Sequence, residues 1–372
     1  MRHSLNYGPL VHAAPLLMGL LADTSLGAQT SRTIPSTPAC NSCSIEVRRI
    51  ASLGNDSDPA SARRFHVGVS RDSRGRYYVA PMADLAFIAV FDSTGRFLKQ
   101  LGRRGKGPGE YQYVMMAHVG PNDSLYVLDE FNKRLTVLTP DHSVARIVPV
   151  RGTLTHGFPL PDGRFVAAGR FLTPERLGLP LHLLDSTGVV RSFGATDPSV
   201  RSNEFQAQLR QIALARKGGV WSARMDRYEV ERWTLDGERV SHLAREAAWF
   251  PAWTEYSVRP PDIARPKPML RAIWEDGEGR LWTVTEVAKD NWRAMRPDPG
   301  GEAKIPPLDV YERTTEAMIE VLDVERGQVI ASTRVPAYIR GMVSPGVLHA
   351  LRSTPEGDTR VDIWQVTLHG AR

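Results

Sequence analysis

The chain has 372 residues, 42% of them hydrophobic and 24% charged, a composition typical of an ordinary globular protein with a real core. The net charge of +6 comes from basic residues scattered along the chain. Nucleic-acid-binding proteins usually gather positive charge on one stripe or patch, so we expect no nucleic-acid partner.

Residues 1–28 have the outline of a secretory signal peptide. Arg2 supplies a positive start, residues 11–22 form a short apolar run, and small residues precede Gln29. The run is too short to span a bilayer, and no later segment reaches that length, so we expect no transmembrane segment. These residues predict an exported protein, periplasmic or extracellular, with a misassigned start codon as the alternative.

Residues 29–43 are expected to form an N-terminal linker that contains the only two cysteines, Cys40 and Cys43. Two thiols cannot complete the four-ligand shell of a structural zinc site. In an exported protein a local disulfide between them is the simplest interpretation, and a lipid anchor on Cys40 is a weaker alternative.

A short turn followed by an aromatic or aliphatic strand recurs six times. It occupies residues 75–79, 123–127, 163–167, 218–222, 279–283 and 345–349. Four-stranded propeller blades repeat about every 40–50 residues, and the later intervals here are longer, so the later repeats carry insertions. The most obvious insertion covers residues 290–311, which are rich in proline, glycine and charge.

A second strand pair with an Asp- and Gly-containing turn follows the marker, as in residues 86–101. Helical periodicity is almost absent. The best helix candidate is residues 202–215, and even this segment could be a loop leading into a strand. The fold class predicted from these patterns is all-β.

Two stretches resemble NHL repeats, which form six-bladed β-propellers. The D-x-x-N-x-R pattern falls on Asp129, Asn132 and Arg134, and a G-x-G-P-G-E loop covers residues 105–110. The other repeats match in outline. The resemblance is closest to exported bacterial NHL-like propellers without an assigned activity, and it implies a six-bladed β-propeller over residues 44–370.

The two ends of this region agree with a closed ring. Residues 46–53 have the character of an outermost strand, and residues 360–368, with Trp364, form a third strand that no fourth strand follows. We expect the N-terminal strand to complete the C-terminal blade, which protects sheet edges.

Two loops that could suggest chemistry are better explained as structure. The glycine-rich residues 102–109 lack the helix that a phosphate loop requires and are expected to link two blades. The acidic residues 275–279 lack the ligand spacing of a calcium loop and are expected to form a solvated turn. We predict no catalytic residue, no metal site and no cofactor.

Aligning the innermost strands on their turns suggests one binding site. His66, His156, Arg210, Arg271 and Arg340 precede equivalent turns, at positions that would line one mouth of the central channel. Arginines gathered there would suit carboxylate or phosphate groups. The competing interpretation is that these arginines pair with carboxylates between blades and support the ring.

The function expected from the sequence is therefore an exported, non-catalytic propeller that binds a ligand or partner protein at one face. The first ligand class to test is an anionic small molecule, peptide or glycan. A channel-centred enzyme, such as a metal-dependent lyase or lactonase, is the alternative, and an assembly scaffold is a third, because the propeller fold hosts them all.

Overall fold

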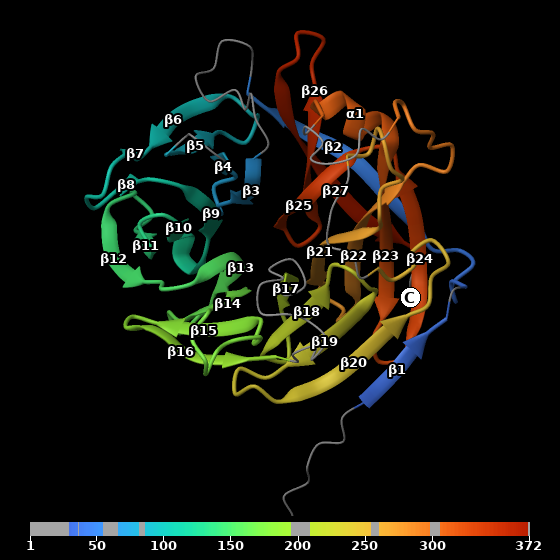
Figure 1. Cartoon of the computed structure of the whole chain (residues 1–372), viewed down its shortest axis with the longest axis horizontal. Helices are drawn as coiled ribbons and strands as arrows, with labels where there is room; N and C mark the ends of the chain where they lie inside the picture. Colours follow the sequence, from blue (N-terminus) through green and yellow to red (C-terminus); the bar gives the residue numbers. More distant parts are fainter. Residues whose placement is uncertain are drawn as a thin grey trace, which may run out of the picture.

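The structure is a computed structural model that describes residues 30–35, 37–54, 66–81, 86–194, 209–253, 260–297 and 306–370. Six β-sheets stand around a central axis, and the chain passes from one to the next in sequence order (Figure 1). The described residues contain only one α-helix, α1 (Leu308–Thr314), and one 3-10 turn, η1 (Pro121–Asp123). The predicted all-β, six-bladed propeller is confirmed.

Each blade is a meander of antiparallel strands. Blades 1 to 3 comprise β3 (His66–Arg71), β4 (Tyr77–Pro81), β5 (Ile88–Phe91) and β6 (Phe97–Leu101); β9 (Val114–Val119), β10 (Leu125–Asp129), β11 (Arg134–Leu138) and β12 (Val144–Pro149); β13 (Thr153–Pro159), β14 (Phe165–Arg170), β15 (Leu181–Asp185) and β16 (Gly188–Phe193).

Blade 5 follows the same plan, and blades 4 and 6 each include one strand from the N-terminal segment. They comprise β17 (Arg210–Leu214), β18 (Val220–Arg224), β19 (Glu229–Trp233), β20 (Arg239–Arg245) and β1 (Thr30–Ile34); β21 (Met269–Glu275), β22 (Leu281–Ala288), β23 (Thr315–Asp323) and β24 (Gln328–Val335); β25 (Tyr338–Ser344), β26 (Val347–Ser353), β27 (Thr359–His369) and β2 (Ser44–Leu53).

The first strand of each blade is the innermost. First strands of neighbouring blades contact one another around the whole ring, in the order β3, β9, β13, β17, β21, β25 and back to β3. Six clusters of buried apolar side chains fill the six interfaces between adjacent blades. The core is therefore distributed around the ring, and each blade depends on both of its neighbours.

The ring closes at blade 6. Strand β2 pairs antiparallel with β27, from Ser44 opposite His369 to Leu53 opposite Val361. This is the pairing expected for residues 46–53, and it places an N-terminal strand at the outer edge of the last sheet.

The N-terminal segment also differs from expectation. Residues 29–43, expected as a linker, contain β1, which pairs in parallel with the outer strand β20 of blade 4. The chain then touches blade 5, where the Ala39 amide donates to the Val329 carbonyl at 2.8 Å, before it reaches β2. The cause is packing, because Ile34 is fully buried in the core between blades 4 and 5.

The remaining sequence expectations concern the loops. Residues 202–208 of the candidate helix lie outside the described residues, and its C-terminal part is strand β17. The expected insertion, residues 290–311, lies between β22 and β23 and includes the start of α1. The glycine-rich loop links blades 1 and 2, as expected, through the short parallel pair β7 (Arg103–Arg104) and β8 (Glu110–Tyr111).

Candidate functional site

One face of the ring carries the hairpins that join the first and second strands of the blades, and we call it the turn face. In blade 5 the hairpin is built by Asp276. One oxygen of its carboxylate accepts the backbone N–H groups of Glu278 and Arg280 at 2.9 and 3.0 Å, and Gly279 adopts a φ of +81°. This geometry favours glycine and presents Glu275, Glu278 and Arg280 at the surface.

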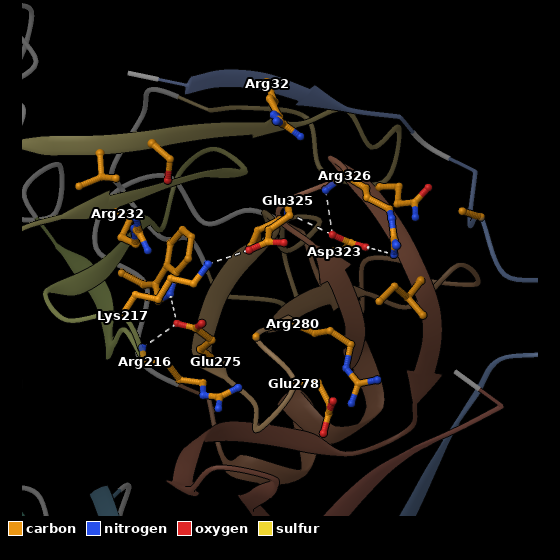
Figure 2. Close-up of a pocket in the computed structure, with 18 of the residues that line it drawn as sticks. Arg32, Arg216, Lys217, Arg232, Glu275, Glu278, Arg280, Asp323, Glu325 and Arg326 are labelled. Atoms are coloured by element: carbon orange, nitrogen blue, oxygen red, sulfur yellow. Dashed lines mark hydrogen bonds and ion pairs between the residues drawn. The ribbon is translucent and has the colours of Figure 1, made fainter. Parts of the chain in front are cut away.

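A groove of about 960 Å³ runs along the turn face between blades 4 and 5, and we call it the basic groove (Figure 2). Its walls include the first hairpins of both blades, the outer hairpin of blade 5, strand β20 and the N-terminal segment. The charged residues that line it are six cations and four acids: Arg32, Arg216, Lys217, Arg232, Arg280 and Arg326; Glu275, Glu278, Asp323 and Glu325.

Several of these charges neutralise one another. Lys217 Nζ lies 2.9 Å from a Glu325 carboxylate oxygen, and Arg326 Nη1 lies 3.0 Å from an Asp323 oxygen. The hydrogen bond from Lys217 holds the pKa of the Glu325 carboxyl below its usual range. Arg280 binds Asp276 at 2.8 Å. These groups form a solvated network with fixed charges.

The guanidinium groups of two arginines of the basic groove have neither a hydrogen-bond acceptor nor an acidic partner among the described residues, namely Arg32 on β1 and Arg232 on β19. The Arg216 guanidinium, by contrast, donates to the Gly277 carbonyl. Arg232 lies above the ring of Trp221, with its guanidinium carbon 5.9 Å from the ring centroid. Trp221 is held in turn by its indole N–H, which donates to Glu275 at 2.7 Å. Both guanidinium groups thus keep their hydrogen-bond donors available to an anion in the groove.

The N-terminal segment forms one wall of the basic groove. Besides Arg32, this wall includes Ala39, Cys40 and Cys43. Cys40 and Cys43 form a disulfide, with Cα atoms 5.4 Å apart. The disulfide lies between the contact of Ala39 with blade 5 and the start of β2, so it fixes the chain where it turns from one blade to the next.

A second cavity, of about 320 Å³, occupies the centre of the turn face, and we call it the central mouth. Every blade contributes to it from the end of its first strand or the following turn. One residue from each blade, in ring order, is Arg71, Pro121, Phe158, Leu214, Trp274 and Met342. Its lining is mostly apolar, in contrast to that of the basic groove.

Glu275 borders both the central mouth and the basic groove. It is the last residue of β21, so its side chain stands where the innermost strand meets the first hairpin of blade 5. One carboxylate oxygen accepts both the Trp221 indole N–H and the Arg216 backbone N–H, the latter at 3.0 Å. The two cavities are therefore adjacent and share a fixed boundary.

The five residues expected from the sequence lie on the innermost strands. His66 is the first residue of β3, and its side chain lies outside the described residues. Arg210 opens β17, is buried, and donates to the Leu209 carbonyl at 3.0 Å. His156 lies on β13 with its ring edge-on to Phe158, and burial lowers its pKa to about 4.

Arg271 and Arg340 are the two that the described contacts bring together, and a carboxylate joins them. Glu286 on β22 accepts Arg271 Nη2 at 2.6 Å and Arg340 Nη1 at 3.2 Å through the same oxygen. Arg340 belongs to blade 6 and Glu286 to blade 5, so this cluster braces two blades. It lies toward the starts of β21 and β25, away from the turn face. This pairing favours the competing interpretation of the sequence, in which these arginines pair with carboxylates between blades and support the ring.

Sequence reasoning missed the basic groove because its key residues lie on outer strands and on β1. Arg32 falls in the expected linker, and Arg232 precedes Trp233 in a strand that looked purely structural. A usable signal was the cluster of charge in the blade 5 hairpins, since residues 275, 278–280 and 323–326 line the groove. Only the pairing of β1 with β20 adds Arg32.

In the part of the chain that the structure describes, no helix is long and apolar enough to cross a membrane. Within the same residues, no three His, Cys, Asp or Glu side chains are grouped so that they could hold a metal ion.

Comparisons with known proteins agree with the architecture. A family model described as a 6-bladed beta-propeller matches residues 67–138. A provisionally assigned exported protein of Bacteroides fragilis NCTC 9343 has a similar structure, with a TM-score of 0.59, 12% identity, and coverage of 92% of this chain and 100% of that one. No curated protein matches the chain.

Two other solved structures extend this comparison. A member of the DUF4221 family from Bacteroides vulgatus ATCC 8482 has a TM-score of 0.60 at 11% identity, covering 87% of this chain and 98% of its own. Virginiamycin B lyase from Staphylococcus aureus has a TM-score of 0.45 at 10% identity, covering 87% of this chain and 99% of its own. Identities this low show the fold alone. The chain is a six-bladed β-propeller.

Proposed function

We propose that this protein is an exported, non-catalytic binding propeller, and that it binds an anionic ligand in the basic groove of its turn face. The observation that carries the proposal is the pair Arg32 and Arg232, which line the groove without an acidic partner among the described residues. Guanidinium groups bind carboxylate, sulfate and phosphate through paired, charge-assisted hydrogen bonds.

The other charges of the groove suit recognition better than proton transfer. The Glu325 carboxylate accepts a hydrogen bond from Lys217, and that bond lowers the pKa of the Glu325 carboxyl and favours its ionised form. A general acid or base needs a pKa near the working pH, which such contacts oppose. Six cations against four acids leave the groove net positive and attractive to an anion.

Export is supported by the composition of residues 1–28 and by the Cys40–Cys43 disulfide. Disulfides persist mainly in oxidising compartments such as the periplasm and the extracellular space.

The test is isothermal titration calorimetry with citrate, sulfate and inorganic phosphate as probes. We expect at least one of them to bind, with an affinity that falls as salt screens the groove. The double variant Arg32→Gln, Arg232→Gln should weaken binding at least about tenfold per arginine, because a hydrogen bond to a charged group contributes about 1.5–3 kcal/mol.

The matched control is Arg96→Gln, which changes an exposed arginine paired with Asp92 on blade 1, outside the groove. Its affinity should equal that of the unmodified protein. The proposal fails if none of the three anions binds, or if the double variant binds as tightly as the control.

A further inference from the structure

We infer that the central mouth holds the apolar end of the same ligand, so that the ligand is an amphiphile with an anionic group at one end and an aliphatic chain at the other. This inference rests on the proposed function for its anionic end. It assigns a role to the apolar lining of the central mouth, which an anion bound in the basic groove would not contact.

The chemistry of the central mouth suits an uncharged group. Phe158, Leu214, Trp274 and Met342 face it from four different blades. Trp274 stacks on Trp282 with ring centroids 5.2 Å apart, which keeps this wall rigid. Of the lining side chains, Leu214 is 37% exposed, and an apolar ligand would remove that surface from water.

The charged groups at the rim of the central mouth are Arg71, whose guanidinium lies over the Tyr77 ring at 5.2 Å, and Glu275, and the histidines beside Phe158 add no charge at neutral pH. His118 borders the mouth, and His118 and His156 both lie edge-on to Phe158, at 4.7 and 5.2 Å between ring centroids. Burial lowers the pKa of His118 to about 3 and that of His156 to about 4. Both rings are therefore neutral at pH 7.

The two cavities are neighbours that share one lining residue. Glu275 borders both, and its carboxylate is already bound by Trp221 and Arg216. A ligand that crosses this boundary with an uncharged segment avoids the carboxylate, places its chain in the central mouth and brings its anionic group toward Arg232, which lies on the third strand of blade 4. Polar ligands alone would leave the apolar lining unused, and apolar ligands alone would leave the two arginines unused.

The experiment compares the linear carboxylates hexanoate, octanoate, decanoate and dodecanoate with the matching alcohols, by calorimetry on the purified full chain below their micelle concentrations. The carboxylates should bind up to about fourfold more tightly per added methylene, as expected for burial of about 0.8 kcal/mol per CH₂. Each carboxylate should bind more tightly than its alcohol.

Variants separate the two halves of the site. Met342→Gln and Leu214→Gln should flatten the chain-length dependence. Their controls are Met295→Gln and Leu177→Gln, which change residues that are 46% and 40% exposed outside the mouth and should leave it intact. Arg232→Gln should reduce the preference for the carboxylate and leave the chain-length dependence unchanged.

Each outcome decides a separate point. Carboxylates that bind without any dependence on chain length, or with a dependence that Met342→Gln and Leu214→Gln leave intact, overturn this inference and leave the proposed function standing. Alcohols that bind as tightly as carboxylates, with the expected chain-length dependence, support the central mouth and overturn the anionic role of the groove. No binding of any of the eight compounds overturns the inference.

Discussion

At the scale of residues, the D-x-x-N-x-R pattern is a structural lock between blades 1 and 2. The fully buried Asp129 carboxylate accepts the backbone N–H groups of Gln112 and Tyr113, both at 3.0 Å, and the Asn132 side chain at 2.6 Å. Asn132 and Arg134 donate to carbonyls of the glycine-rich loop, with Arg134 reaching Gly107 at 2.7 Å. These residues hold the loop between the blades, in agreement with its structural interpretation.

The variant Asp129→Asn tests this lock. The amide replaces one acceptor oxygen with a donor that faces other donors, so buried N–H groups lose their partner. We expect the free energy of unfolding to fall by about 1–3 kcal/mol. Urea unfolding measures the change. Asp236→Asn, at a side chain that is 84% exposed, is the control, and an equal loss in both variants would reject the lock.

At the scale of elements, strand β1 and the segment after it join blades 4, 5 and 6 along the outside of the ring. β1 adds a parallel strand to blade 4, Ala39 contacts blade 5, and β2 completes blade 6. A buried ion pair strengthens the same region, because Arg245 of blade 4 binds Glu320 of blade 5 at 2.9 Å and also donates to the Pro35 carbonyl. The N-terminal segment is therefore part of the propeller.

Ile34→Ala measures what β1 contributes. Ile34 is fully buried in the core between blades 4 and 5, so truncation leaves a cavity and should cost about 2–5 kcal/mol. Thermal unfolding should show a clearly lower midpoint. Arg32→Gln, two residues earlier on an exposed site, should leave the midpoint unchanged while it weakens anion binding. Equal midpoints for Ile34→Ala and the unmodified protein would show that β1 does not stabilise the ring.

At the scale of the whole molecule, three histidines with lowered pKa values make the stability of the folded ring depend on pH. Burial lowers the pKa of His118 to about 3 and the pKa values of His156 and His182 to about 4, whereas an unfolded histidine titrates near 6.5. Between these values the unfolded chain binds more protons than the folded ring. The stability that these neutral histidines contribute is therefore fully present above about pH 6.5 and is lost as the pH falls toward 4.

The prediction is a fall in the free energy of unfolding of up to about 1.4 kcal/mol per pH unit for each histidine across that window. Urea unfolding at several values between pH 7.5 and 4.5 gives the slope. His156→Gln should make the slope shallower, and Leu177→Gln, the same replacement at an exposed site without a titrating group, should not. An unchanged slope in His156→Gln would show that this histidine titrates alike in the folded and the unfolded chain.

The ring could be predicted from the sequence because each blade contains a recognisable local pattern, a turn followed by a strand. Six turn-and-strand markers, with Gly75, Gly163, Gly218, Gly279 and Gly346 all at positive φ in the structure, give the blade count. The site could not be predicted in the same way. Whether Arg271 and Arg340 are available depends on Glu286, which lies on the strand after that of Arg271 and in the blade before that of Arg340. Arg32 enters the groove only through a parallel pairing with a strand more than 200 residues away.

The seam at blade 6 has a consequence for how the molecule is made. Arg48 on β2 and Gln365 on β27 share a hydrogen bond although 317 residues separate them. During synthesis β2 exists long before its partner, while the five preceding sheets can already assemble from contacts between successive strands. We therefore expect the seam to form last, because closing so long a stretch of chain costs entropy, and until it forms the edge of β27 is open to other chains. A chain cut short before β27 would leave both edges of the ring unpaired.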